Sequence, residues 1–341
     1  MAPETSAQQV RAGEILDRIM TTDMRLYFEE KVCAALYEGA RRASNDGSNE
    51  PLSLVAAKRI MSRVRAGSVF VVMTGWPTAY RPCGETDGPL GAVILARAIA
   101  KACEATPVFL GEPDVASSLV PLCRVAGLNV LDLEVAKAYK SSAHVRSVPI
   151  GDEPCRKVVE TLLPELRPSC VVSVERPGRN EKGVHHYTRG VSTSEGIAYL
   201  DYLFAAAQQE QILTVGIGDL GNELGLGKIK EVVAKYVKLG AKCLCPCGGG
   251  IAASDPADIT VFSTTSNWGA YGVAAALAIL QGDPAVFHTG DIERALLRAS
   301  REYGIVDGAL DSPSLSVDTI PEDADVGIVE MMGVIVRKAL Q

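Results

Sequence analysis

The chain has 341 residues, which is enough for one large domain or two of ordinary size. Apolar side chains make up 47% of it, so a sizeable core can form and disorder as the main state is excluded. The 34 basic and 41 acidic side chains give a net charge of -7, which argues against a nucleic-acid-binding protein. No apolar run approaches the roughly 18 residues of a membrane span, so we expect no membrane partner.

The nine cysteines are scattered and odd in number, and the start of the chain lacks the pattern of a secretory signal. We therefore expect reduced thiols and a cytoplasmic protein. Acidic residues near the start are unusual for a mitochondrial transit peptide, although the mitochondrial matrix stays open as an alternative. Assembly into a homo-oligomer also stays open.

The first part of the chain is predicted to be helical. Apolar residues recur at helical spacing at 15–20, 32–40 and 54–64. A polar stretch, Ser44 to Pro51, interrupts them. We expect residues 1–50 to form a helical segment that packs on a main domain spanning residues 51–341.

Short apolar, β-branched runs then alternate with alanine- and leucine-rich stretches. The predicted strands are 68–73, 107–110, 130–133, 143–150, 170–174, 212–217, 241–245 and 259–264. The predicted helices are 90–103, 114–125, 154–164, 196–208, 229–238 and 269–281. This alternation predicts an α/β fold in which a largely parallel or mixed sheet is covered by helices on both faces, in one compact unit with one or two lobes.

Ligands of such folds bind beyond the carboxyl ends of the strands, so the loops there carry the candidate functional residues. After the first strand come Glu85, Thr86, Asp87 and Gly88, just ahead of a predicted helix. Two acids and a threonine near unpaired backbone N–H groups suit an ion or a polar ligand. An ordinary helix cap formed by Thr86 or Asp87 is the alternative.

The loop after residue 174 is rich in arginine. Arg176, Arg179 and Arg189 are candidates for binding an acidic substrate, because a guanidinium matches the two oxygens of a carboxylate. A solvated charged loop is the alternative. Neighbouring His185 and His186 would point in different directions on a strand, so we expect each to be a surface or structural histidine rather than one of a pair on one metal.

The loop after residue 217 offers Asp219, Asn222 and Glu223 among several glycines. Oxygen ligands at this spacing favour Mg²⁺ or Mn²⁺, with Ca²⁺ also suitable. A tight structural turn is the alternative. The segment also matches G-x-G-x-x-G, but Asp219 would repel a pyrophosphate and no suitable acid follows at the required spacing, so we expect no nucleotide cofactor.

Two further features remain. Asn267 and Trp268 open a helix after the last predicted strand, where they suit a pocket wall or, for Asn267, a plain helix cap. Cys243, Cys245 and Cys247 lie in a predicted strand that ends in a glycine turn. Structural zinc sites usually combine two separate ligand pairs, and no second cysteine pair exists, so we expect no metal there.

Four of these loops together resemble the D-glutamate cyclase C-terminal domain family. The matching segments are GETDGPLGA from Gly84, ERPGR from Glu175, GIGDLGNELGLG from Gly216 and SNWG from Ser266, with later Asp-Gly and Val-Asp elements at 307–308 and 317–318. The resemblance runs from about residue 15 to the end of the chain. The stretch KCLCPCGGG departs from the family pattern and is peculiar to this chain.

The resemblance implies conversion of a small acidic amino acid, D-glutamate, to 5-oxo-D-proline with loss of water, assisted by a divalent metal. On that basis Asp219, Asn222 and Glu223, with Glu175, would hold the ion. Glu85 or Asp87 would bind the ammonium group or take its proton. A metal-dependent hydrolase of a phosphate ester or amide, and a non-catalytic sensor of an anionic metabolite, are the alternatives.

Overall fold

The computed structural model describes residues 5–45, 47–78 and 80–341. Its helices are α1 (Ala7–Met20), α2 (Glu30–Ser44), α3 (Leu52–Arg63), α4 (Pro89–Cys103), α5 (Pro113–Val125), α6 (Leu133–Ala138), α7 (Asp152–Leu166), α8 (Asp201–Gln209), α9 (Lys230–Tyr236), α10 (Ser266–Gln281), α11 (Gly290–Glu302) and α12 (Glu322–Ala339). Its strands are β1 (Val69–Thr74), β2 (Thr106–Gly111), β3 (Asn129–Val130), β4 (Ser142–Ser147), β5 (Cys170–Val174), β6 (Leu213–Gly218), β7 (Ile259–Phe262), β8 (Ser316–Val317) and β9 (Ile320–Pro321).

Within the described residues, seven strands form one sheet in the order β3-β4-β2-β1-β5-β6-β7, and every pair in it is parallel. The chain builds outward from β1 through β2, then returns to the other side of β1 with β5. Strands β1 and β5 therefore flank the point where the winding reverses, which is where ligands bind in such sheets. The prediction of an α/β fold with a parallel sheet is confirmed.

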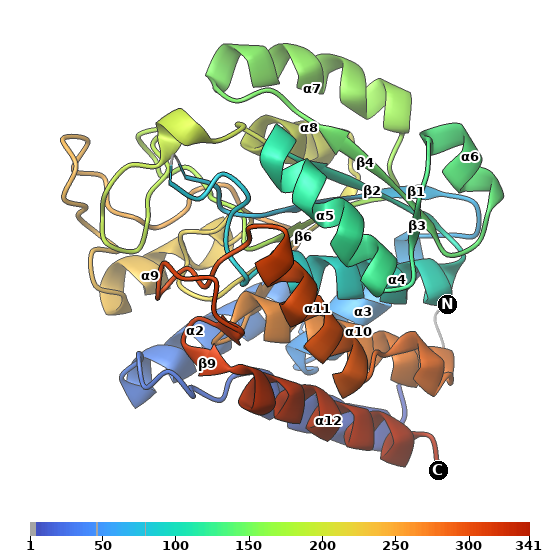
Figure 1. The fold of residues 1–341 in the computed structure, drawn as a ribbon. Coiled ribbons are helices and arrows are strands. Elements are labelled where there is room, and N and C mark those ends of the chain that lie inside the picture. The colour runs from blue at the N-terminus through green and yellow to red at the C-terminus, as the bar shows by residue number, and fades with distance from the viewer. Residues whose placement is uncertain (1–4, 46, 79) are drawn as a thin grey trace.

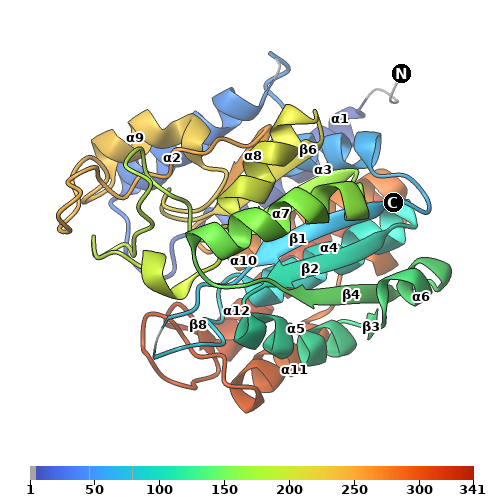
Figure 2. The same ribbon diagram turned by 90° about the horizontal axis from the view of Figure 1, so that it is seen from above.

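Helices cover both faces of the sheet, as Figures 1 and 2 show. On β1, Val69, Val71 and Met73 pack against α7 and α8, while Phe70 and Val72 face the larger core formed with α3, α4 and α10. This alternation follows from the two-residue period of a strand. Helix α2 packs on β7 at one edge of the sheet, whereas α12 lies beyond that second layer, against α1, α10 and α11 (Figure 1).

The N-terminal helices share the main core. Leu16 and Met20 of α1 are fully buried in it. Asp17, also buried, accepts hydrogen bonds from the backbone N–H groups of Leu52 at 2.6 Å and Ser53 at 3.1 Å, and so caps α3. Burial raises the pKa of Asp17, although these bonds lower it.

The predicted strand at 241–245 is wrong, since those residues form bends and irregular backbone. The amide of Leu244 donates to the carbonyl of Gly190 at 3.1 Å, so this segment pairs with a loop instead of the sheet. Smaller differences occur elsewhere. β3 ends at Val130, and α8 begins only at Asp201. Helices α11 and α12 were not anticipated from the sequence.

No helix in the described parts of the chain combines the length and apolar composition that crossing a bilayer requires.

Candidate active site

A cavity of about 1360 Å³ opens beyond the carboxyl ends of β1, β5 and β6. Seven acids among the described residues line it. Burial or a neighbouring carboxylate groups Glu85, Asp87, Glu175, Asp219 and Asp318, and Glu195 and Asp311 also lie on the wall. Glu85, Asp87, Glu175 and Asp219 follow strands of the sheet, and Asp318 comes from the turn between β8 and β9. The fold thus places carboxylates from distant parts of the sequence around one space.

These carboxylates are close enough to share a cation. One oxygen from each of Asp87, Asp219 and Asp318 lies within 4.8 Å of the others, and the same holds for Glu175, Asp219 and Glu223. Asp219 belongs to both groups. Carboxylate oxygens at such distances are the ligands that Mg²⁺ and Mn²⁺ prefer.

Burial and mutual repulsion perturb the acids strongly. Burial, and then the charge of Asp318, raise the pKa of Glu85 to about 8, against the lowering effect of Arg81. Burial, then Asp219, raise the pKa of Glu175 well above its usual range. Burial is also the main reason why the pKa of Asp318 rises to about 6. Several carboxyl groups are therefore easily protonated when no cation is present.

Arg25 supplies positive charge inside this group. Its guanidinium donates to Asp219 at 2.9 Å and also contacts Asp318 and the carbonyl of Thr264. The residue comes from the segment between α1 and α2, so the N-terminal helices bring a cavity residue as well as core residues.

A divalent cation fits the residues around Asp219. The side-chain oxygen of Asn222 is buried and has no hydrogen-bond partner among the described residues, while its nitrogen donates to the carbonyl of His186 at 2.9 Å. Glu223 accepts the amides of Leu220 at 3.1 Å and Gly221 at 2.8 Å, which fixes its carboxylate beside Asp219. An unpaired amide oxygen next to carboxylates suits a hard metal ion.

Asp87 and Asn267 cap each other's helices. Asp87 accepts the amides of Ser266 at 2.9 Å and Asn267 at 2.8 Å at the start of α10. The Asn267 side chain accepts the amides of Gly88 at 2.8 Å and Gly91 at 2.7 Å at the start of α4. This exchange satisfies donors at both helix ends and holds the two loops together.

The neighbouring residues Thr86 and Gly88 shape the same junction. The Thr86 hydroxyl donates to the carbonyl of Ser316 at 2.9 Å. Gly88 has φ +102°, and a Cβ there would lie 2.6 Å from the Cβ of Glu175. Thr86, Gly88 and Asn267 do not line the cavity, so they act on it through the loops that they position.

The three arginines that the sequence predicted to bind an acidic substrate have different surroundings. Arg176 is buried and forms a bidentate ion pair with Glu112 at 2.7 and 2.5 Å, which joins the loops after β2 and β5. Arg179 pairs with Asp255 at 2.9 and 3.1 Å. Both lie outside the cavity, whereas Arg189 lines it. Trp268 also lies outside, where its indole donates to Asp325 at 2.6 Å.

Sequence reasoning missed Arg25 and Arg81, which both line the cavity. Arg81 lies 3.3 Å from Glu85 and donates to the carbonyl of Gly308 at 3.0 Å. Arg25 follows a helix, so the rule that directed attention to strand ends could not find it, whereas Arg81 lies in the loop after β1 and was passed over in favour of the acids that follow it. Asp318 was noticed only as part of the family resemblance.

The chain is an α/β protein with an acidic cavity at the winding reversal of its parallel sheet, the place where proteins of this class bind small ligands. The family model described as "D-glutamate cyclase-like, C-terminal" matches residues 35–333. The chain belongs to this family, as its four loop motifs predicted.

A curated relative is similar over a large part of the chain. The mitochondrial D-glutamate cyclase of Homo sapiens is 30% identical over 241 residues, which cover 65% of this chain and 34% of the relative. The chain thus spans about a third of that protein's length.

Proposed function

We propose that the cavity cyclises D-glutamate to 5-oxo-D-proline and water, assisted by a divalent cation. The observation that carries this proposal is the convergence of Glu85, Glu175 and Asp219 with the unpaired oxygen of Asn222, in a chain of the D-glutamate cyclase-like family. The name of the human relative supports the same reaction.

The reaction joins two ends of one molecule. The substrate nitrogen bonds to its γ-carboxyl carbon, one carbon–oxygen bond breaks, and that oxygen leaves as water with the two protons that the ammonium group gives up. The charges and atoms therefore balance without a further reactant. Because the attack is intramolecular, holding the chain of the substrate in a folded shape supplies much of the rate.

Proton transfer is assigned to Glu85. Asp87 already accepts three backbone amides, from Gly88, Ser266 and Asn267, which commits it to the helix ends. Glu85 lines the cavity, has only Arg81 as a charged partner within 4 Å among the described residues, and has a pKa of about 8. A group with a pKa near neutral pH suits both removal and delivery of a proton.

Arg189 is the candidate for binding the α-carboxylate of the substrate. It lines the cavity, and its guanidinium forms no ion pair within the described residues. Its fork of donors matches a carboxylate. Arg176 and Arg179 are less suitable, because their guanidinium groups are already paired.

Asp219, Asn222, Glu223 and Glu175 would hold the cation. When bound, it supplies positive charge that makes a carboxylate more electrophilic and stabilises negative charge on oxygen. The protein's part is to hold the acids close together and keep the site largely dry, since Glu223 and Asn222 are fully buried.

The test is to incubate the purified chain with D- or L-glutamate and with Mg²⁺, Mn²⁺ or a chelator, and to separate the products on a chiral column. We expect 5-oxo-D-proline from D-glutamate, with the rate reduced by chelation. Glu85→Gln, which keeps the size of the side chain, should bind D-glutamate but turn it over at least about 100-fold more slowly. Binding without product under every cation condition would indicate a sensor and would reject the cyclase proposal.

A further inference from the structure

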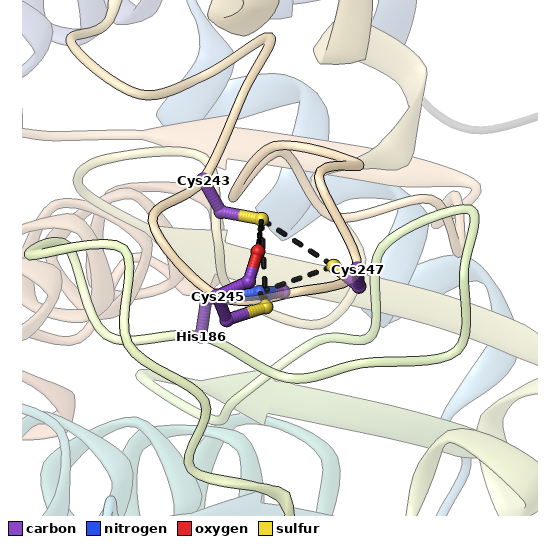
Figure 3. A group of neighbouring side chains, drawn as sticks. All are labelled: His186, Cys243, Cys245 and Cys247. Atoms are coloured by element: carbon purple, nitrogen blue, oxygen red, sulfur yellow. Dashed lines mark hydrogen bonds between the residues drawn. The ribbon is translucent and has the colours of Figure 1, made fainter.

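Four metal-ligating side chains meet outside the acidic cavity. They are His186, from the segment after β5, and Cys243, Cys245 and Cys247, from the turn-rich segment 241–250 between α9 and β7. One ligand atom from each lies within 4.8 Å of all the others. Figure 3 shows the three sulfur atoms and the imidazole pointing toward one another.

Four of the distances between the ligand atoms lie within about 0.5 Å of those of a tetrahedral zinc site. The Cys243 sulfur lies 3.6 Å from that of Cys245 and 3.3 Å from that of Cys247. The His186 Nε2 atom lies 3.1 Å from the Cys245 sulfur and 3.6 Å from the Cys247 sulfur. Zinc–sulfur bonds of about 2.3 Å and a zinc–nitrogen bond of about 2.1 Å place tetrahedral sulfurs about 3.8 Å apart and sulfur and nitrogen about 3.6 Å apart.

The surroundings also suit thiolate ligands. The side-chain nitrogen of Asn180 and the amide of Gly249 each donate to the Cys247 sulfur, both at 3.5 Å. Donors of this kind stabilise a negatively charged sulfur. Cys243 and His186 are buried, which would keep a bound ion from solvent.

We propose that His186, Cys243, Cys245 and Cys247 bind one structural zinc ion. Three thiolates and one imidazole complete the four positions that zinc takes in structural sites, and nitrogen and sulfur ligands favour zinc over the hard cations suited to the acidic cavity. Each thiol gives its proton to solvent as its bond to zinc forms. The prediction that these cysteines bind no metal was based only on the lack of a second cysteine pair in the sequence. The fold supplies a histidine 59 residues from Cys245 instead.

The ion would join the cysteine segment to one wall of the acidic cavity. Tyr187 and Arg189, next to His186 in sequence, line that cavity. The carbonyl of His186 accepts the side chain of Asn222 at 2.9 Å, and the amide of Leu244 donates to Gly190 at 3.1 Å. Zinc would add coordinate bonds between two loops that are otherwise joined by these hydrogen bonds.

The first test measures metal in the full chain, purified under reducing conditions from zinc-supplemented medium. We expect about one zinc per chain. Cys245→Ser should lose it, while Cys103→Ser, a thiol at the end of α4, and Asp219→Asn should keep it. Replacement by Co²⁺ should give a thiolate-to-cobalt absorption band in the wild type and in both controls, and none in Cys245→Ser. This band separates the cysteine site from cations in the acidic cavity.

The second test measures the link between the segments by limited trypsin digestion and mass spectrometry. Arg189 and Lys242 are exposed and flank the cluster. Removal of zinc by a chelator should accelerate cleavage at these two positions, and added zinc should reverse the effect. Any one of three results would overturn the proposal. They are wild-type protein without bound zinc, a disulfide between Cys243 and Cys247 in freshly purified protein, and cleavage at a rate that does not change with zinc.

Discussion

Truncation of Asn267 tests whether this side chain holds the framework of the site. Its oxygen accepts the amides of Gly88 at 2.8 Å and Gly91 at 2.7 Å, and its nitrogen donates to the carbonyl of Thr86 at 2.9 Å. Asn267→Ala would leave the amide of Gly91 and the carbonyl of Thr86 buried without these partners, while the amide of Gly88 keeps its bond to Asp87 at 3.0 Å. Each such group costs about 1–3 kcal/mol, so two cost about 2–6 kcal/mol before the loops relax.

Relaxation and entry of water should reduce this loss, and we expect about 2–4 kcal/mol of lost unfolding free energy. The assay is urea denaturation followed by circular dichroism, with the midpoint and slope fitted together. Asn129→Ala is the matched control, because Asn129 is exposed on β3 and its change should cost less than about 0.5 kcal/mol. A loss below about 1 kcal/mol for Asn267→Ala would refute the argument that this residue caps α4.

Three further changes test other parts of the account. Asp219→Asn should remain folded by circular dichroism, bind Mn²⁺ weakly in calorimetry and lose about 100-fold or more in turnover; wild-type Mn²⁺ affinity would show that the loop is only a structural turn. Gly88→Ala should lower the stability by about 2–4 kcal/mol in thermal unfolding, because φ is +102° and the new Cβ would meet Glu175 at 2.6 Å; an unchanged melting temperature would contradict the reported contact. Arg176→Met should cost about 3–5 kcal/mol in urea denaturation by leaving Glu112 buried and unpaired, and Glu112→Gln in the same chain should recover part of it. No recovery in the double variant would argue against the pair.

The sheet and most of the acidic loops were predictable from the sequence, because both follow local rules. Continuous apolar runs marked the buried strands, and polar residues directly after them had to meet at one edge of a parallel sheet. This reasoning identified Glu85, Asp87 and Asp219 as candidates, the family resemblance added Glu175, and the structure places all four around one cavity.

The sequence could not show which side chains from distant segments would contact one another. Nothing local distinguishes the guanidinium of Arg176, which is paired with Glu112, from that of Arg189, which lines the cavity. Arg25 lies between two helices and reaches the site only because α1 and α2 pack on the main core. The strand predicted for Cys243 failed for a similar reason, since its segment is organised by contacts with the loop around His186.

The most direct test of the central claim uses D-glutamate in which both γ-carboxyl oxygens are ¹⁸O. The chain, with Mg²⁺ or Mn²⁺, should release 5-oxo-D-proline that retains one of the two labels in its ring carbonyl, and the other label should appear in water by mass spectrometry. Glu85→Gln should suppress both signals together. Unchanged D-glutamate after incubation with either cation would contradict the account.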